Sequence, residues 1–149
     1  MNTEIICTGD GSYTLRNEHF GETYHSINGA VSESMHIFIN LGLRNFTNTK
    51  INILEIGYGT GLNAILTFNE NKSLCNKIFY HGIEKFPIDS KAFTDFVENT
   101  QALSSINADN IMKFSSDWNT EVEISPNFTL YKQKIDFAEF SPAKKYDLI

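Results

Sequence analysis

The sequence lacks the features that define several classes of protein. In 149 residues no apolar run approaches the roughly 18 residues of a membrane-spanning helix. The start, MNTEIICTGDGS, has neither the basic segment nor the apolar segment of a secretory signal. Cysteine is scarce, and Cys7 and Cys75 are expected to be reduced thiols rather than part of a disulfide framework. We therefore expect a cytoplasmic protein with no membrane partner.

Positive charge and metal-binding motifs are also in short supply. The chain has 12 lysines and arginines against 18 aspartates and glutamates, a net charge of −6. This balance disfavours a nucleic-acid binder, although an acidic protein can carry a local basic patch. No C-x-x-C or H-x-x-x-H spacing connects the cysteines with the histidines His19, His25, His36 and His81, so no metal site is expected.

What the sequence does contain is an alternation of strand and helix patterns. Such an alternation predicts an α/β fold with a parallel, doubly wound sheet. A hairpin, a polar loop and a helix precede it, so we expect a lead-in over residues 1–49 and an α/β domain over 50–149. Residues 107–127 give no firm prediction. A hairpin is predicted at 10–15, and helices are predicted at 30–43, 60–72 and 87–106. Pro87 suits the first turn of the last of these helices. Strands are predicted at 50–56, 77–84, 127–136 and 145–149.

The fourth predicted strand is only a few residues long when the sequence ends. Four strands would leave a long unprotected sheet edge, which natural proteins avoid. We therefore expect the N-terminal part of a larger domain, truncated at its fourth strand. The alternative is a small complete domain.

The stretch ILEIGYGTGLN (53–63) is typical of a loop that holds a ligand against bare backbone. Its G-x-G-x-G spacing differs from the G-x-G-x-x-G of dinucleotide-binding loops, and it lacks the Gly-Lys-Ser/Thr ending of a P-loop. Glu55, two residues before Gly57, would repel a pyrophosphate but suits a ligand with cationic groups. The alternative is a purely structural role, in which the glycines form a tight turn without a ligand.

S-adenosylmethionine (SAM) is such a ligand, because it carries a sulfonium and an ammonium, and its carboxylate can use a helix N-terminus. Glu84 ends the next predicted strand and is placed to accept from the two ribose hydroxyls. Asp136 follows the third strand and is placed to accept from the adenine amino group, or alternatively to cap a helix. The glycine loop and these two acids lie at the carboxyl ends of adjacent strands, where open α/β sheets bind ligands.

Two stretches, LEIGYGTGLN and GIEKFPI (82–88), resemble the methyltransferase domain of the MnmC tRNA-modification enzymes. The lead-in DGSYTL…FGETYHSINGAVSES resembles that of the stand-alone members, which lack a fused flavin-dependent oxidoreductase domain. The resemblance runs from about residue 10 to the end. It implies a Rossmann-like class I sheet and methyl transfer from SAM to the 5-aminomethyl group of the wobble 2-thiouridine (U34) in tRNA, with a separate flavin-dependent oxidoreductase as a further partner.

The resemblance also implies which residues contact the cofactor. After its fourth strand the family carries an Asp-x-Phe-x-Pro motif that lines the methylation site, whereas this sequence ends at Asp147, Leu148 and Ile149. The catalytic residues are therefore unassigned, and this chain by itself is expected to be inactive. The cofactor positions are Tyr24, Glu55, Gly57, Tyr58, Gly59, Thr60, Gly61, Asn63, Glu84, Lys85 and Asp136.

Other interpretations of the same residues stay open. A SAM-dependent methyltransferase could act on a small molecule or a protein, which the acidic charge favours, and a non-catalytic cofactor-binding module would need no acceptor. His25 and Ser26 either face the substrate or form an ordinary polar turn. Phe86, Phe93 and Phe96 are expected to pack in the core rather than stack on bases.

Overall fold

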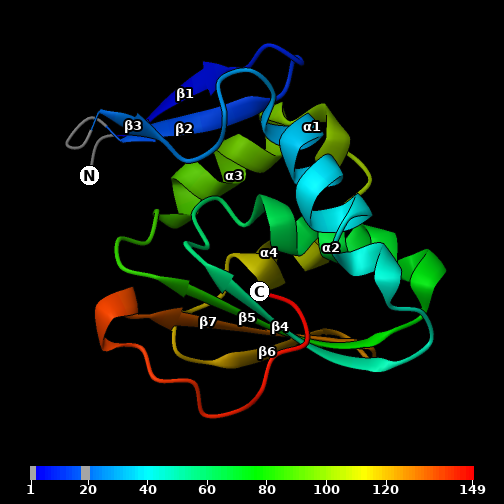
Figure 1. The fold of residues 1–149 in the computed structure, drawn as a ribbon. Coiled ribbons are helices and arrows are strands. Elements are labelled where there is room, and N and C mark those ends of the chain that lie inside the picture. The colour runs from blue at the N-terminus through cyan, green and yellow to red at the C-terminus, as the bar shows by residue number, and fades with distance from the viewer. Residues whose placement is uncertain (1–2, 18–20) are drawn as a thin grey trace.

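A computed structural model describes residues 3–17 and 21–149, which form two β-sheets with helices between them (Figure 1). The smaller sheet is antiparallel, in the order β1-β2-β3, and forms the predicted lead-in hairpin. The larger sheet has the order β4-β5-β7-β6. The strands are β1 (Thr3–Cys7), β2 (Tyr13–Asn17), β3 (Glu22–Thr23), β4 (Lys50–Ile56), β5 (Lys77–Glu84), β6 (Glu121–Ser125) and β7 (Phe128–Lys134).

The larger sheet is parallel except at one edge. β4, β5 and β7 run parallel, so their carboxyl ends meet as predicted, while β6 pairs antiparallel with β7. β6 lies in the stretch that gave no firm prediction, although EVEIS alternates with period two and the turn residues Pro126 and Asn127 follow it. The predicted fourth strand is a single parallel bridge between Leu148 and Ile53 of β4.

The helices α1, α2, α3 and α4 lie on one face of this sheet, between it and the smaller sheet (Figure 1). α2 begins and ends within two residues of its predicted bounds. The first helix differs from prediction, because it turns π-helical after five residues. α3 also differs: Asp89 caps it by accepting from the Ala92 N–H at 2.8 Å, so Pro87 lies outside. The helices are α1 (Ala30–Ser34), η1 (Met35–Asn40), η2 (Leu43–Asn45), α2 (Leu62–Leu74), α3 (Ser90–Asn99), η3 (Gln101–Leu103), α4 (Ala108–Phe114) and η4 (Phe137–Glu139).

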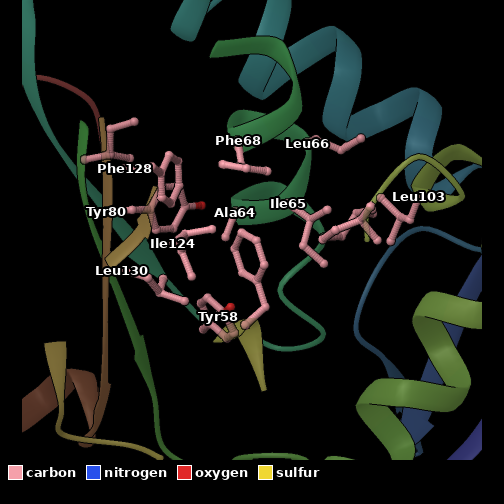
Figure 2. Close-up of a cluster of buried hydrophobic side chains, with 14 of the residues drawn as sticks. Tyr58, Ala64, Ile65, Leu66, Phe68, Tyr80, Leu103, Ile124, Phe128 and Leu130 are labelled. Carbon is pink, nitrogen blue, oxygen red and sulfur yellow. The ribbon is translucent and has the colours of Figure 1, made fainter. Parts of the chain in front are cut away.

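The main core lies between α2 and the parallel strands (Figure 2). Tyr80 of β5 stacks on Phe128 of β7 with ring centres 5.9 Å apart, and Phe68 of α2 meets Phe128 edge-on at 5.5 Å. Each fully buried aromatic ring contributes about 1.5–3 kcal/mol relative to exposure. Phe93 and Phe96 are buried in the same cluster, as predicted, while Phe86 is only half-buried. The core therefore fixes the strands whose ends carry the candidate site.

The opposite face of the sheet carries the alternate side chains of β5. It is covered by the segment after β7, where the Tyr146 hydroxyl lies 2.6 Å from His81 Nδ1. Lys144 Nζ lies 3.5 Å from the centre of the Phe79 ring. Burial is the main cause that lowers the pKa of His81. His81 therefore packs against the segment after β7, on the face of the sheet opposite the helices.

One carboxylate joins the lead-in hairpin to α1. Asp10 Oδ1 accepts from Thr8 Oγ1 at 2.7 Å and from the Ser12 N–H at 3.0 Å, and Oδ2 accepts from the Ser32 N–H at 2.9 Å. Burial acts to raise the pKa of Asp10, but the hydrogen bonds from Ser12, Ser32 and Thr8 outweigh it and hold the pKa well below its usual range. The hairpin turn and the start of α1 are therefore fixed relative to each other.

Candidate cofactor site

The glycine loop connects β4 to α2, and its glycines adopt backbone conformations that suit glycine. Gly59 has φ of +53° and Gly61 has φ of +75°, a region that residues with a Cβ rarely adopt. A Cβ on Gly59 would lie 2.8 Å from Tyr24 Cδ1, and one on Gly61 would lie 2.8 Å from the Tyr58 hydroxyl. Gly57 N and Tyr58 N both donate to the Ile83 carbonyl, at 3.0 and 2.9 Å, which ties the loop to the end of β5.

Glu84 faces this loop from the end of β5. Its Oε2 accepts from the Gly59 N–H at 3.0 Å, and its Oε1 accepts from the Phe86 N–H at 2.8 Å. The second acid of the predicted pattern and the second glycine of the loop are therefore in contact. A carboxylate has about four lone-pair sites, so two backbone N–H groups leave each oxygen able to accept another donor.

Glu55 lies beneath the loop. Its side chain is 7% exposed; Oε1 accepts from Asn63 Nδ2 and Oε2 from the Tyr80 hydroxyl, both at 2.8 Å. Burial raises the pKa of Glu55 to about 7; these two hydrogen bonds oppose the rise, and the charge of Glu84 adds to it. Glu55 differs from Glu84 in being buried, and a direct contact of Glu55 or Asn63 with a ligand stays a prediction.

Lys85 and Asp136 form an exposed ion pair at the carboxyl ends of β5 and β7. Lys85 Nζ lies 2.5 Å from Asp136 Oδ2, and the bond lowers the pKa of Asp136 and raises that of Lys85. Asp136 Oδ1 also accepts from the Ala138 N–H at 3.0 Å and so caps η4. The helix-cap interpretation of Asp136 is therefore confirmed. Its contact with adenine stays a prediction.

Tyr58 brings together two residues that the sequence did not single out as functional. Its ring packs over Gly82 and meets Trp118 edge-on, with ring centres 5.7 Å apart. Lys132, 3% exposed in β7, has Nζ 5.1 Å from the centre of the Trp118 ring. It also donates to the carbonyls of Phe114 (2.9 Å) and Ser116 (2.5 Å).

Burial lowers the pKa of Lys132 to about 8, although the charge of Asp117 acts to raise it. The sequence signal was a lysine at an otherwise buried position of the strand FTLYKQK. Lysine is almost never fully buried unless its ammonium has partners. A lysine at a core position of a parallel strand could therefore have been identified as unusual.

Two neighbouring cavities open beside the loop and share Pro87, Ile88, Asp89 and Lys134. The first, of about 290 Å³, reaches Tyr58, Gly59, Trp118 and Lys132. The second, of about 190 Å³, reaches Tyr24 and Lys85. Four of the predicted site residues therefore line open space at the sheet edge: Tyr24, Tyr58, Gly59 and Lys85.

Thr60 faces the lead-in rather than these cavities. Its side chain is 0% exposed, and its Oγ1 lies 2.8 Å from His25 Nε2. His25 is thus more than part of a polar turn, because it contacts the glycine loop. No local pattern in the sequence predicts this contact, which joins residues 35 positions apart.

Metal-binding and membrane features can be checked in residues 3–17 and 21–149. No three His, Cys, Asp or Glu side chains there are grouped to hold a metal ion. His19 lies outside the described residues. Within the same ranges no helix is long and apolar enough to cross a membrane.

A parallel sheet, a glycine loop leading into a helix, and an acid at the end of the next strand define a Rossmann-like α/β protein. Open α/β sheets bind ligands outside the carboxyl ends of their strands, where this loop and this acid lie. In structure the chain is similar to MnmC2 from Aquifex aeolicus, with a TM-score of 0.58 and 25% identity over 91% of this chain and 43% of that one. The predicted fold class, with the Rossmann-like sheet of a methyltransferase, is confirmed.

The same resemblance is found in sequence, although no family model matches the chain. The chain is similar to the tRNA 5-methylaminomethyl-2-thiouridine biosynthesis bifunctional protein MnmC of Burkholderia multivorans. The two are 29% identical over 105 residues, which are 64% of this chain and 16% of that protein. The MnmC protein of Leptospira interrogans is 34% identical over 105 residues, 62% of this chain and 16% of that protein. The chain thus spans a small part of these relatives and less than half of MnmC2. The resemblance to the MnmC enzymes predicted from the sequence is confirmed.

Proposed function

We propose that the chain forms the cofactor-binding part of a SAM-dependent methyltransferase that methylates the 5-aminomethyl group of wobble 2-thiouridine (U34) in tRNA. The observation that carries this proposal is the contact between Glu84 and the Gly59 N–H, at 3.0 Å, in a chain similar to MnmC proteins. It joins a glycine loop to an acid at the end of the next strand. That pairing suits a ligand with both a carboxylate and a ribose.

The residues present fit SAM by the chemistry of their donors and acceptors. The loop and the N-terminus of α2 offer backbone N–H groups to the cofactor carboxylate. Glu84 accepts from the ribose hydroxyls, and Asp136 from the adenine amino group. Tyr24 and Lys85 border the cavity next to Asp136. Glu55 of β4 and Asn63 of α2 hydrogen-bond to each other and so fix the two ends of the loop.

SAM supplies an activated methyl group when bound. The protein's contribution to such a transfer is mainly to position the reactants, an effect that supplies several kcal/mol of the barrier in well-oriented reactions. The residues of this chain hold the cofactor, and none of them is proposed as the general base.

We further propose that tRNA and a separate flavin-dependent oxidoreductase are partners of the protein. The protein is cytoplasmic, and residues 1–49 form a lead-in to the SAM-binding domain.

Calorimetric titration with SAM tests the cofactor assignment. The parent chain is expected to bind, and Glu84→Ala to weaken binding at least tenfold because the ribose acceptor is lost. Glu98→Ala, which alters an exposed glutamate on α3, is the matched control and is expected to bind like the parent. Equal affinity of Glu84→Ala and the parent would contradict the ribose assignment.

The acceptor needs a separate experiment. Hypomodified tRNA incubated with the protein and methyl-labelled SAM is expected to gain label in the wobble nucleoside. A protein that binds SAM but leaves this nucleoside unlabelled would contradict the tRNA assignment. The net charge of −6 would then favour a small-molecule or protein acceptor.

A further inference from the structure

The lead-in touches the glycine loop directly, at two consecutive residues. His25 Nε2 lies 2.8 Å from Thr60 Oγ1. The ring of Tyr24 packs against Gly59, where an added Cβ would lie 2.8 Å from Tyr24 Cδ1. The lead-in thus covers the middle of the loop, the part between its second and third glycines.

The backbone at His25 is held by the small sheet. Its backbone N–H donates to Thr14 Oγ1 at 2.9 Å, and the preceding Tyr24 N–H donates to the Leu15 carbonyl at 2.9 Å. Thr14 and Leu15 belong to β2 and are both fully buried. The imidazole is therefore presented to Thr60 from a fixed support.

The imidazole is neutral at physiological pH. Burial lowers the pKa of His25 to about 4, although the charge of Glu33 acts to raise it. A neutral imidazole has one donor and one acceptor nitrogen, and a threonine hydroxyl can fill either role. The hydrogen bond to Thr60 is satisfied in either tautomer.

The contact restrains the part of the loop whose residues have the greatest intrinsic freedom. Thr60 stands between Gly59 and Gly61, both at positive φ, and glycine has more conformational freedom than any other residue. Glu84 holds the Gly59 N–H from the sheet side, and His25 holds the Thr60 side chain from the lead-in side. A loop fixed from two sides loses less entropy when a ligand binds, and so binds it more tightly.

We propose that His25 is a positioning residue of the cofactor site, which holds the glycine loop through Thr60 in the conformation that binds SAM. The inference rests on the proposed function for its ligand, but the restraint of the loop is a property of the protein alone. It makes the lead-in part of the cofactor site. Neither the fold nor the acids at the strand ends imply this.

The test is a double-mutant cycle on SAM affinity, measured by calorimetry. His25→Ala and Thr60→Val are each expected to raise the Kd about fivefold to tenfold, the loss that one neutral hydrogen bond explains. The double variant is expected to bind about as weakly as either single one, because both remove the same contact. His25→Gln and Thr60→Ser keep a polar partner and are expected to recover most of the affinity. His36→Ala, at an exposed histidine of η1, is the control.

Hydrogen exchange without any ligand separates this inference from the proposed function. The Gly59 and Gly61 amides, bonded to Glu84 and to the Tyr58 carbonyl, are expected to exchange faster in His25→Ala and at the parent rate in His36→Ala. If the amides exchange faster in His25→Ala but the parent protein binds no SAM, the restraint of the loop by His25 is supported and the cofactor assignment is overturned. Unchanged exchange, additive losses in the cycle, or full affinity in His25→Ala would each overturn the role of His25.

Discussion

Replacing Glu55 with glutamine is expected to stabilise the fold above pH 7 and to have little effect below pH 4.5. The carboxyl group is buried beneath the glycine loop, and burial raises its pKa from 4.5 to about 7. Between these pH values the folded protein keeps the proton that the unfolded chain has already released. The folded state therefore binds more protons, and its stability falls as the pH rises through this window. Above about pH 7 the loss is complete.

The size of the effect follows from the two pKa values. A difference of about 2.5 corresponds to about 3 kcal/mol, at 1.36 kcal/mol for each pKa unit. The amide has no charge to bury, and its oxygen can still accept from the Tyr80 hydroxyl. Its NH₂ group would face Asn63, whose side-chain oxygen is buried with no hydrogen-bond partner among the described residues. Rotation of the Asn63 amide would bring that oxygen round to accept.

Urea unfolding at several pH values between 4 and 8.5 measures this directly. Trp118 is the only tryptophan in the sequence and packs against Tyr58 next to the loop, so its fluorescence reports on unfolding. The stability difference between Glu55→Gln and the parent is expected to grow with pH and to level off above 7, while titration of other groups cancels. Glu98→Gln, at an exposed site, is expected to follow the parent. A difference that stays constant with pH would refute the reasoning.

Two further substitutions test the loop and the buried lysine. Gly59→Ala is expected to cost about 1–2 kcal/mol because φ is +53°, as thermal unfolding would show. It is also expected to weaken SAM binding, measured by calorimetry, because the new Cβ meets Tyr24. Lys132→Met keeps the apolar stem but leaves the Phe114 and Ser116 carbonyls without their donor. It should lower the free energy of unfolding by about 1–3 kcal/mol, and an unchanged urea midpoint would contradict the partnership.

The parts of the fold that local pattern determines were predictable. β4 and β5 follow from short apolar runs bounded by polar residues, and the loop from its glycines. The approach of Glu84 to the loop follows from topology, since parallel neighbours end at the same edge. These predictions needed only the order of residues along the chain.

Other features depend on contacts between distant segments, which one sequence does not show. The inward orientation of Glu55 is one case, because a strand buried on both faces has no period-two pattern that separates them. Lys132 is another, because its burial depends on Trp118 and on the carbonyls that follow α4. The bond from His25 to Thr60 depends on how the lead-in folds back, and no residue near either partner indicates it.

The carboxylate of Asp10 is one of the contacts from which we expect remote segments to open as one cooperative unit. It bonds the hairpin turn to the start of α1, while β2 supports His25 and His25 holds Thr60. We therefore expect an opening fluctuation of the hairpin to loosen the glycine loop as well. Amide protection in β1 and β2 and amide protection in the loop should rise and fall together, as one subglobal unfolding unit rather than two.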